Sequence, residues 1–212
     1  MGETDEEGSE ARLSRIDYGG SKSKYAVAFR LKHPLDEARN LATFKLVPKA
    51  VSERHKWDMR VRYVTLPGGG IDGGPEHAEQ VIVDGLTQGH YEDASLDQYW
   101  IKWIYSERAP CLGRVDNACG RLLQRLINAQ DEAADAPRLE IFYSFETDEE
   151  ALREIKSAID SLKEAGAEPL LVSRDKGRDS VEVEKRQRFY EAQLDKDIGY
   201  AVRHLGMSTG TD

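Results

Sequence analysis

Two short segments of this chain combine a histidine, a glutamate and both cysteines in a pattern suited to metal-assisted hydrolysis. The first is residues 75–79, Pro-Glu-His-Ala-Glu, and the second is residues 106–111, Ser-Glu-Arg-Ala-Pro-Cys, which Cys119 follows. A catalytic zinc ion takes three protein ligands, commonly imidazole and thiolate, and leaves one position open for water. The sequence therefore predicts that His77, Cys111 and Cys119 bind Zn²⁺.

Glu79 supplies the acid–base group that such a site needs. Zinc lowers the pKa of bound water from ~15.7 to about 7, which creates a nucleophile at neutral pH. Glu79 lies two residues after His77 and is not needed as a ligand, so it can move protons between the water and a leaving group. Pro110 fixes the backbone just before Cys111.

Together these segments resemble the zinc-dependent cytidine deaminase-like superfamily, whose signature is His-x-Glu followed by Pro-Cys-x-x-Cys. The Ser-Glu-Arg-x-Pro-Cys segment and the long spacing between the cysteines are most similar to bacterial toxin-type deaminases of nucleic acids or nucleotides. The resemblance implies an α/β, three-layer fold, with a mixed sheet of about five strands and helices on both faces. It also implies a hydrolase acting on cyclic amidines, which converts cytosine to uracil with Glu79 as the catalytic residue.

The spacing of the cysteines departs from the family pattern. Seven residues separate Cys111 from Cys119, whereas the family motif has two. The insert must loop out for Cys119 to reach the metal, and Gly113 and Asn117 make such a loop feasible. If the loop cannot close, Asp116 is the substitute ligand.

The substrate has two interpretations. Residues 20–67 contain eleven Lys or Arg and four Asp or Glu, which favours nucleic acid, and DNA in particular. Trp103, Tyr105, Ser106 and Pro110 are the candidate substrate contacts, although the two aromatic side chains are more often core residues than stacking platforms. The net charge of −9 favours the alternative, a free nucleoside, nucleotide or small-molecule base.

Non-enzymatic interpretations stay open beside these. His77 alone is compatible with a surface helix, and two cysteines are compatible with burial as small hydrophobic side chains. A non-catalytic zinc site would need a fourth ligand and no Glu79. An effector module is a further alternative, in which the helix at residues 181–205 binds a partner or immunity protein.

The hydrophobic pattern predicts alternating strands and helices. We expect strands at residues 25–31, 41–47, 59–66, 98–105, 139–145 and 169–173. We expect helices that begin near His77, over residues 117–133, from a capping box at Thr147 to Gly166, and over residues 180–205. This order predicts a flexible acidic tail at residues 1–20, a deaminase domain at 20–175, and a C-terminal helix and tail at 176–212.

Length and composition set the class of protein. The chain has 212 residues with 33% charged side chains, and no apolar run approaches the ~18 residues of a membrane helix. Residues 1–10 hold five acidic residues and no basic one, which is unlike a signal peptide. We therefore expect a cytoplasmic protein with no membrane association, although a secreted toxin exported by another route is compatible with the same pattern.

Overall fold

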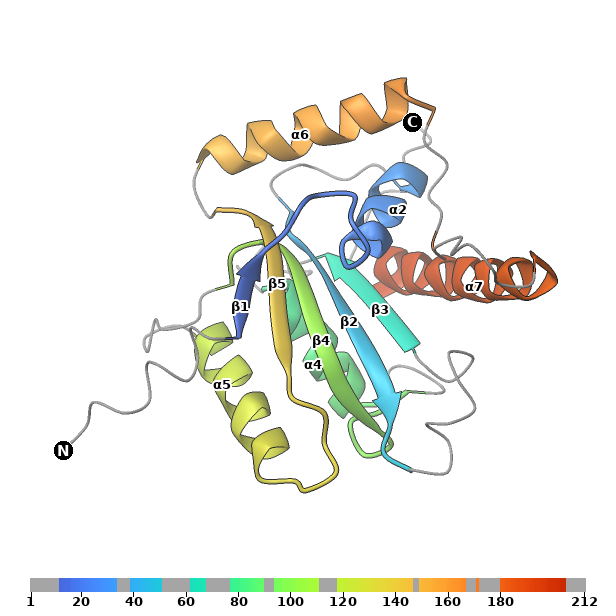
Figure 1. Ribbon diagram of the computed structural model, residues 1–212. Helices are drawn as coiled ribbons and strands as arrows, with labels where there is room; N and C mark the ends of the chain where they lie inside the picture. The colour runs from blue at the N-terminus through green and yellow to red at the C-terminus, as the bar shows by residue number, and fades with distance from the viewer. Residues whose placement is uncertain are drawn as a thin grey trace.

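In the computed structural model of this chain, five strands form one mixed sheet in the order β1-β5-β4-β2-β3 (Figure 1). The strands are β1 (Leu13–Arg15), β2 (Leu41–Pro48), β3 (Arg62–Pro67), β4 (Tyr99–Arg108) and β5 (Glu140–Phe145). Strand β2 is antiparallel to both β3 and β4, whereas β5 is parallel to both β4 and β1. The α/β class with a mixed sheet is thus confirmed.

Five helices accompany the sheet in the part of the chain that the structure describes. That part comprises residues 12–33, 39–50, 62–67, 77–89, 94–110, 118–146, 149–166, 171 and 180–204. The helices are α2 (Lys24–Lys32), α4 (Ala78–Thr87), α5 (Ala118–Asp131), α6 (Glu149–Glu164) and α7 (Ser180–His204). None of these helices is long and apolar enough to cross a membrane.

Most predicted elements are found where the pattern places them. Strand β4 lies near the middle of the sheet, and its bulky side chains include the buried Ile101, Trp103 and Tyr105, which suit a pleated surface enclosed by other elements. Helix α6 ends before Gly166, whose φ of 60° is the left-handed conformation typical of a residue just after a helix. The capping residue Thr147 lies outside the described residues.

The first predicted strand is wrong, because residues 24–32 form helix α2 instead. Six consecutive side chains of this helix, from Tyr25 to Arg30, are buried. A helix enclosed on all sides has no polar face, so its sequence lacks the 3.6-residue alternation and is easily mistaken for a buried strand.

The predicted flexible tail is also corrected, since residues 13–15 form the edge strand β1. The backbone of this segment pairs with β5, and the side chain of Arg12 makes a 2.6 Å ion pair with Asp131. Strand β1 is difficult to predict from sequence because it is short and has acidic neighbours. The predicted last strand at residues 169–173 lies outside the described residues except for the buried Leu171.

The helices fall into two groups by their contacts. Helix α4 contacts β2, β3 and α5, whereas α2 contacts β2, β3, α6 and α7. Figure 1 shows α4 behind the sheet and α2 toward the viewer. Helix α7, proposed from sequence as a partner-binding helix, packs against β3 and buries Tyr190, Leu194 and Ala201.

Candidate functional site

Helix α4 brings the predicted histidine and glutamate to its first turn. His77 is the residue just before the helix; it has extended backbone angles, and its carbonyl oxygen accepts a 3.1 Å hydrogen bond from the Val81 N–H. Glu79 is only 1% exposed, and Ala78 and Ile82 of the same helix are fully buried. A glutamate is rarely buried this deeply without a specific role or partner. The helix N-terminus stabilises negative charge at that position.

The strands that precede the two predicted segments end at the same edge of the sheet. Pro67 at the end of β3 and Ser106 near the end of β4 flank the start of β2, opposite Leu41 and Ala42. Since neighbouring strands lie ~4.8 Å apart, the ends of β3 and β4 are roughly 10 Å apart across β2. The chain then enters α4 after β3 and α5 after β4, and these two helices contact each other.

The predicted zinc ligands are described only in part. His77 is half-buried at the start of α4, and Cys119 is the second residue of α5, although its side chain and the whole of Cys111 lie outside the described residues. Asp116 lies there too. Among the residues that the structure does describe, no three His, Cys, Asp or Glu side chains are grouped as metal ligands. Convergence of His77, Cys111 and Cys119 therefore stays a prediction.

The aromatic candidates for substrate contact are core residues. Trp103 is 2% exposed and Tyr105 is fully buried, and the Tyr105 hydroxyl donates a 3.0 Å hydrogen bond to Ser144 Oγ. The Nζ atom of Lys22 lies 5.0 Å from the Trp103 ring centre. This burial argues against base stacking on either ring and for the core role that the sequence also allows.

Ser106 and Pro110 lie at the edge of the sheet where β3 and β4 end. Both are buried, and Asn40 bridges the end of β4 by donating a 2.8 Å hydrogen bond to Ser106 Oγ and accepting one of 3.1 Å from the Arg108 N–H. Asn40 therefore fixes the backbone that leads to Pro110. Contact of Ser106 or Pro110 with a substrate stays a prediction.

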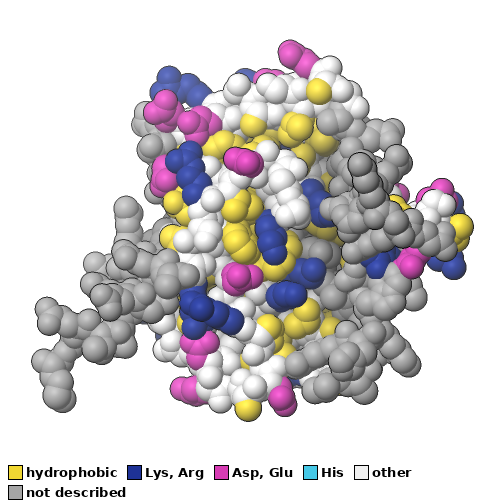
Figure 2. Space-filling view, viewed as in Figure 1, with side chains coloured by type: hydrophobic (Ala, Val, Ile, Leu, Met, Phe, Trp, Pro, Cys, Tyr) yellow, Lys and Arg dark blue, Asp and Glu magenta, His cyan; other side chains and the backbone are white. Residues whose placement is uncertain are grey.

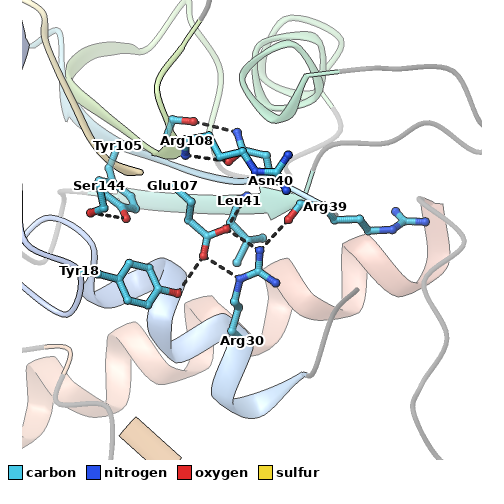
Figure 3. A network of polar contacts seen from close by, with 10 residues as sticks. Tyr18, Arg30, Arg39, Asn40, Leu41, Tyr105, Glu107, Arg108 and Ser144 are labelled. Atoms are coloured by element: carbon cyan, nitrogen blue, oxygen red, sulfur yellow. Dashed lines mark hydrogen bonds and ion pairs between the residues drawn. The ribbon is translucent and has the colours of Figure 1, made fainter. Parts of the chain in front are cut away.

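A second buried glutamate, Glu107, lies between Ser106 and Pro110 in the sequence, and Figure 3 shows its environment. Arg30 of α2 donates from Nε and Nη2 to its two carboxylate oxygens, at 2.7 and 2.6 Å. The Tyr18 hydroxyl and the Leu41 N–H donate two more hydrogen bonds, at 2.9 and 3.0 Å. Both side chains of the ion pair are at most 1% exposed. A buried pair with this many donors offsets the cost of removing its charges from water.

The Glu107 carboxylate also acts on the tyrosines around it. Burial raises the pKa of Tyr18 well above 10.0, and the negative charge of Glu107 raises it further. The pKa of Tyr105 is raised in the same way, first by burial and then by Glu107. Both phenols are therefore neutral donors over the whole physiological pH range.

Sequence reasoning did not identify Arg30, Asn40 or Tyr18. One signal was available: Glu107 interrupts a run of bulky side chains in a central strand, and a charge in that position requires a buried cationic partner. The identity of that partner was hidden because residues 25–31 were interpreted as a strand. Within a helix, Arg30 can reach across to the end of β4.

No model of a known protein family matches this chain, and no curated protein is similar to it in sequence. Among the described residues, His77 and the buried Glu79 begin helix α4, and the end of β4 leads to Pro110. A helix start can hold a metal ligand and a proton-transferring carboxylate two positions apart.

Proposed function

We propose that this protein is a zinc-dependent hydrolytic deaminase that converts cytosine to uracil in nucleic acid. The observation that supports this most directly is the burial of Glu79 in the first turn of α4, two residues after His77. A carboxylate kept from bulk water and close in sequence to an imidazole is what acid–base chemistry at a metal-activated water requires.

The donor set fits zinc. His77, Cys111 and Cys119 would hold the ion, because one imidazole and two thiolates match the ligands of zinc nucleobase deaminases. Cys119 is the second residue of α5, and a helix N-terminus lowers the pKa of a thiol, which favours the ligating thiolate form. When bound, zinc would lower the pKa of its water and so supply the nucleophile.

Glu79 is the residue that moves protons in this proposal. Its carboxylate would accept a proton from the attacking water and then donate protons to the ring nitrogen and to the departing amine. The burial of Glu79 keeps bulk water from this position, which keeps the protons on the reacting groups.

The arrangement of the sheet and helices supports the three-layer form of the fold. Helices α4 and α5 form one contacting group, and α2, α6 and α7 form another, with β2 and β3 contacted by members of both. Helices that cover both faces of one sheet form two such groups, one on each face.

For the substrate, the basic segment at residues 20–67 supports nucleic acid. Burial of Trp103 and Tyr105 removes the argument from stacking on those two rings. A free nucleoside is the second candidate, which the net charge of −9 favours because it weakens attraction to a polyanion.

The Glu79→Ala variant tests the assigned chemistry. We expect it to retain zinc and to lose uracil formation by about 10²- to 10⁴-fold, the usual contribution of a positioned acid–base group. Cys111→Ala should lose the metal as well as the activity, and Glu132→Ala, at an exposed site after α5, is the matched control. Zinc content by atomic absorption and uracil formation by mass spectrometry are the measurements. Unchanged turnover in Glu79→Ala would rule out the role.

A substrate panel separates the two candidates. The protein is incubated with single-stranded DNA, duplex DNA, RNA and free cytidine, and uracil formation is measured in each. We expect conversion in at least one polymer to exceed that of cytidine. Conversion of cytidine alone would support the free-nucleoside alternative instead.

A further inference from the structure

The surface that is turned toward the viewer in Figure 2 carries both basic and hydrophobic side chains. Basic side chains are there interleaved with hydrophobic ones, over the middle of the molecule. Lys22 lies over two rings, with its Nζ atom 5.0 Å from the centre of Trp103 and 4.9 Å from that of Phe142. Lys49 lies over Trp100 at 4.2 Å.

The strand register places further residues on the same surface. Lys45 of β2 is directly opposite Trp103 of β4, and opposed residues of an antiparallel pair share one face. Lys49 continues from the end of β2 and covers Trp100 of β4. The lysines therefore extend along two neighbouring strands, beside the half-buried Trp100 and Phe142.

Charge on this surface is predominantly positive. Burial lowers the pKa of Lys22, the nearby Glu140 opposes that effect, and the positive charge of Lys102 adds to it. Lys102 and Glu140 are therefore close to Lys22, and both are exposed. We call Lys22, Lys45, Lys49 and Lys102, with Trp100 and Phe142, the lysine face. Glu140 is the acidic residue that these data place beside it.

The lysine face is open among the residues that the structure describes. Figure 1 shows no described helix in front of the middle and lower parts of β4 and β5, whereas α2 and Tyr18 cover the upper end near Glu107. Binding a hydrophobic partner to a surface of spaced lysines would cost free energy, because each ammonium group would lose its water. Its charge and rings are complementary to a flexible polyanion with unstacked bases.

We propose that the lysine face binds single-stranded nucleic acid, with Lys22 and Lys49 moving from the rings that they cover to phosphates, so that Trp100 and Phe142 become available to bases. A duplex presents its bases only by their edges, whereas a single strand can place base planes against aromatic side chains on a sheet. The proposal goes beyond the proposed function, because binding here requires neither zinc nor deamination.

A substrate strand that enters the candidate site would continue over the lysine face. Lys45 lies four residues from Leu41 along β2, which corresponds to roughly 13 Å at the rise of an extended strand. A strand bound across both regions would contact the lysine face with its phosphates and leave one base at the edge where β3 and β4 end.

The Lys49→Gln/Lys102→Gln double variant tests this with a fluorescent oligodeoxythymidine, which contains no cytosine and cannot be deaminated. On single strands the slope of log K against log salt is about −0.7 for each phosphate contact. The double variant should therefore reduce the magnitude of the slope by about 1.4 and weaken binding about 25-fold at 0.1 M salt. Fluorescence anisotropy from 0.05 to 0.4 M NaCl provides both values.

Two control proteins complete the experiment. Lys163→Gln/Lys185→Gln removes the same amount of charge from exposed positions on α6 and α7 and should leave the salt slope unchanged. Lys49→Arg/Lys102→Arg keeps the charge of the lysine face and should retain the wild-type slope. A slope that is equal in wild type and Lys49→Gln/Lys102→Gln, or one that falls equally in the α6–α7 control, overturns the proposal. Because oligodeoxythymidine is not a deamination substrate, this result is independent of whether the Glu79 variant loses activity.

Discussion

Two glutamates, Glu79 and Glu107, are almost completely buried, one in the first turn of helix α4 and the other near the end of strand β4. Glu107 accepts four hydrogen bonds, two of them from one guanidinium, and it connects α2, β2 and β4. Glu79 lies two positions after His77, at the start of a helix whose N-terminus favours negative charge.

The difference shows that burial of a carboxylate does not by itself indicate a functional site. Four donors around Glu107 restrict its movement, which suits a structural crosslink between α2, β2 and β4. For Glu79, the proposed function requires exchange of a proton with a group in front of the helix. The hydrogen-bond donors around Glu107, more than its depth, indicate the structural role of that residue.

The largest expected effect on stability separates the two glutamates directly. Glu107→Ala leaves the Arg30 guanidinium buried without its carboxylate, so we expect a loss of about 3–5 kcal/mol in the free energy of unfolding. Glu79→Ala should change that free energy by less than about 1 kcal/mol or increase it, since residues placed for chemistry commonly reduce stability. Urea unfolding followed by circular dichroism measures both.

The double variant Arg30→Met/Glu107→Leu is the control for this comparison. Replacing both charges by apolar side chains removes the unpaired cation, so it should be more stable than Glu107→Ala. Equal destabilisation by Glu79→Ala and Glu107→Ala would contradict the distinction, because it would make both glutamates structural.

The fold could be predicted where one face of an element is polar. Helix α5 was identified from its apolar stripe and β3 from alternation, whereas β4 was identified from its run of bulky and aromatic side chains. Helix α2 was not, because Tyr25–Arg30 are buried on every side and periodicity vanishes. Strand β1 was hidden because its three residues owe their conformation to pairing with β5 and to the Arg12–Asp131 ion pair, neither of which is local in the sequence.

For the site, the sequence could identify residue types but not their spatial relations. His77 and Glu79 were placed correctly at a helix start, because a proline and an acidic first turn indicate one. Trp103 and Tyr105 were ambiguous, since an aromatic residue in a strand is equally suited to a core and to a binding surface. The Arg30–Glu107 pair joins residues 77 positions apart, and no local pattern encodes such a contact.

A smaller effect tests whether the end of β4 that carries Glu107 also supports the predicted cysteine ligand. Asn40→Ala removes two hydrogen bonds to Ser106 and Arg108, which should cost about 1–3 kcal/mol. Because Arg108 leads directly to Pro110, we also expect weaker zinc binding in competition with a chelator. Asn40→Asp keeps the acceptor for the Arg108 N–H and should lose less of both, and unchanged zinc affinity in Asn40→Ala would separate this crosslink from the metal site.

The smallest effect concerns the tyrosine that donates to Glu107, and it emerges only at alkaline pH. Because folding raises the pKa of Tyr18 and Tyr105 above 10.0, the unfolded chain loses these protons first, and stability that is complete below pH 10 falls as the pH rises further. Each tyrosine contributes a decline of about 1.4 kcal/mol per pH unit. Tyr18→Phe should therefore reduce the slope between pH 10 and 11 in urea unfolding by about 1.4 kcal/mol per pH unit. If the slope stays the same, the Tyr18 hydroxyl does not titrate with folding, and the donor set that distinguishes Glu107 from Glu79 is smaller than the geometry indicates.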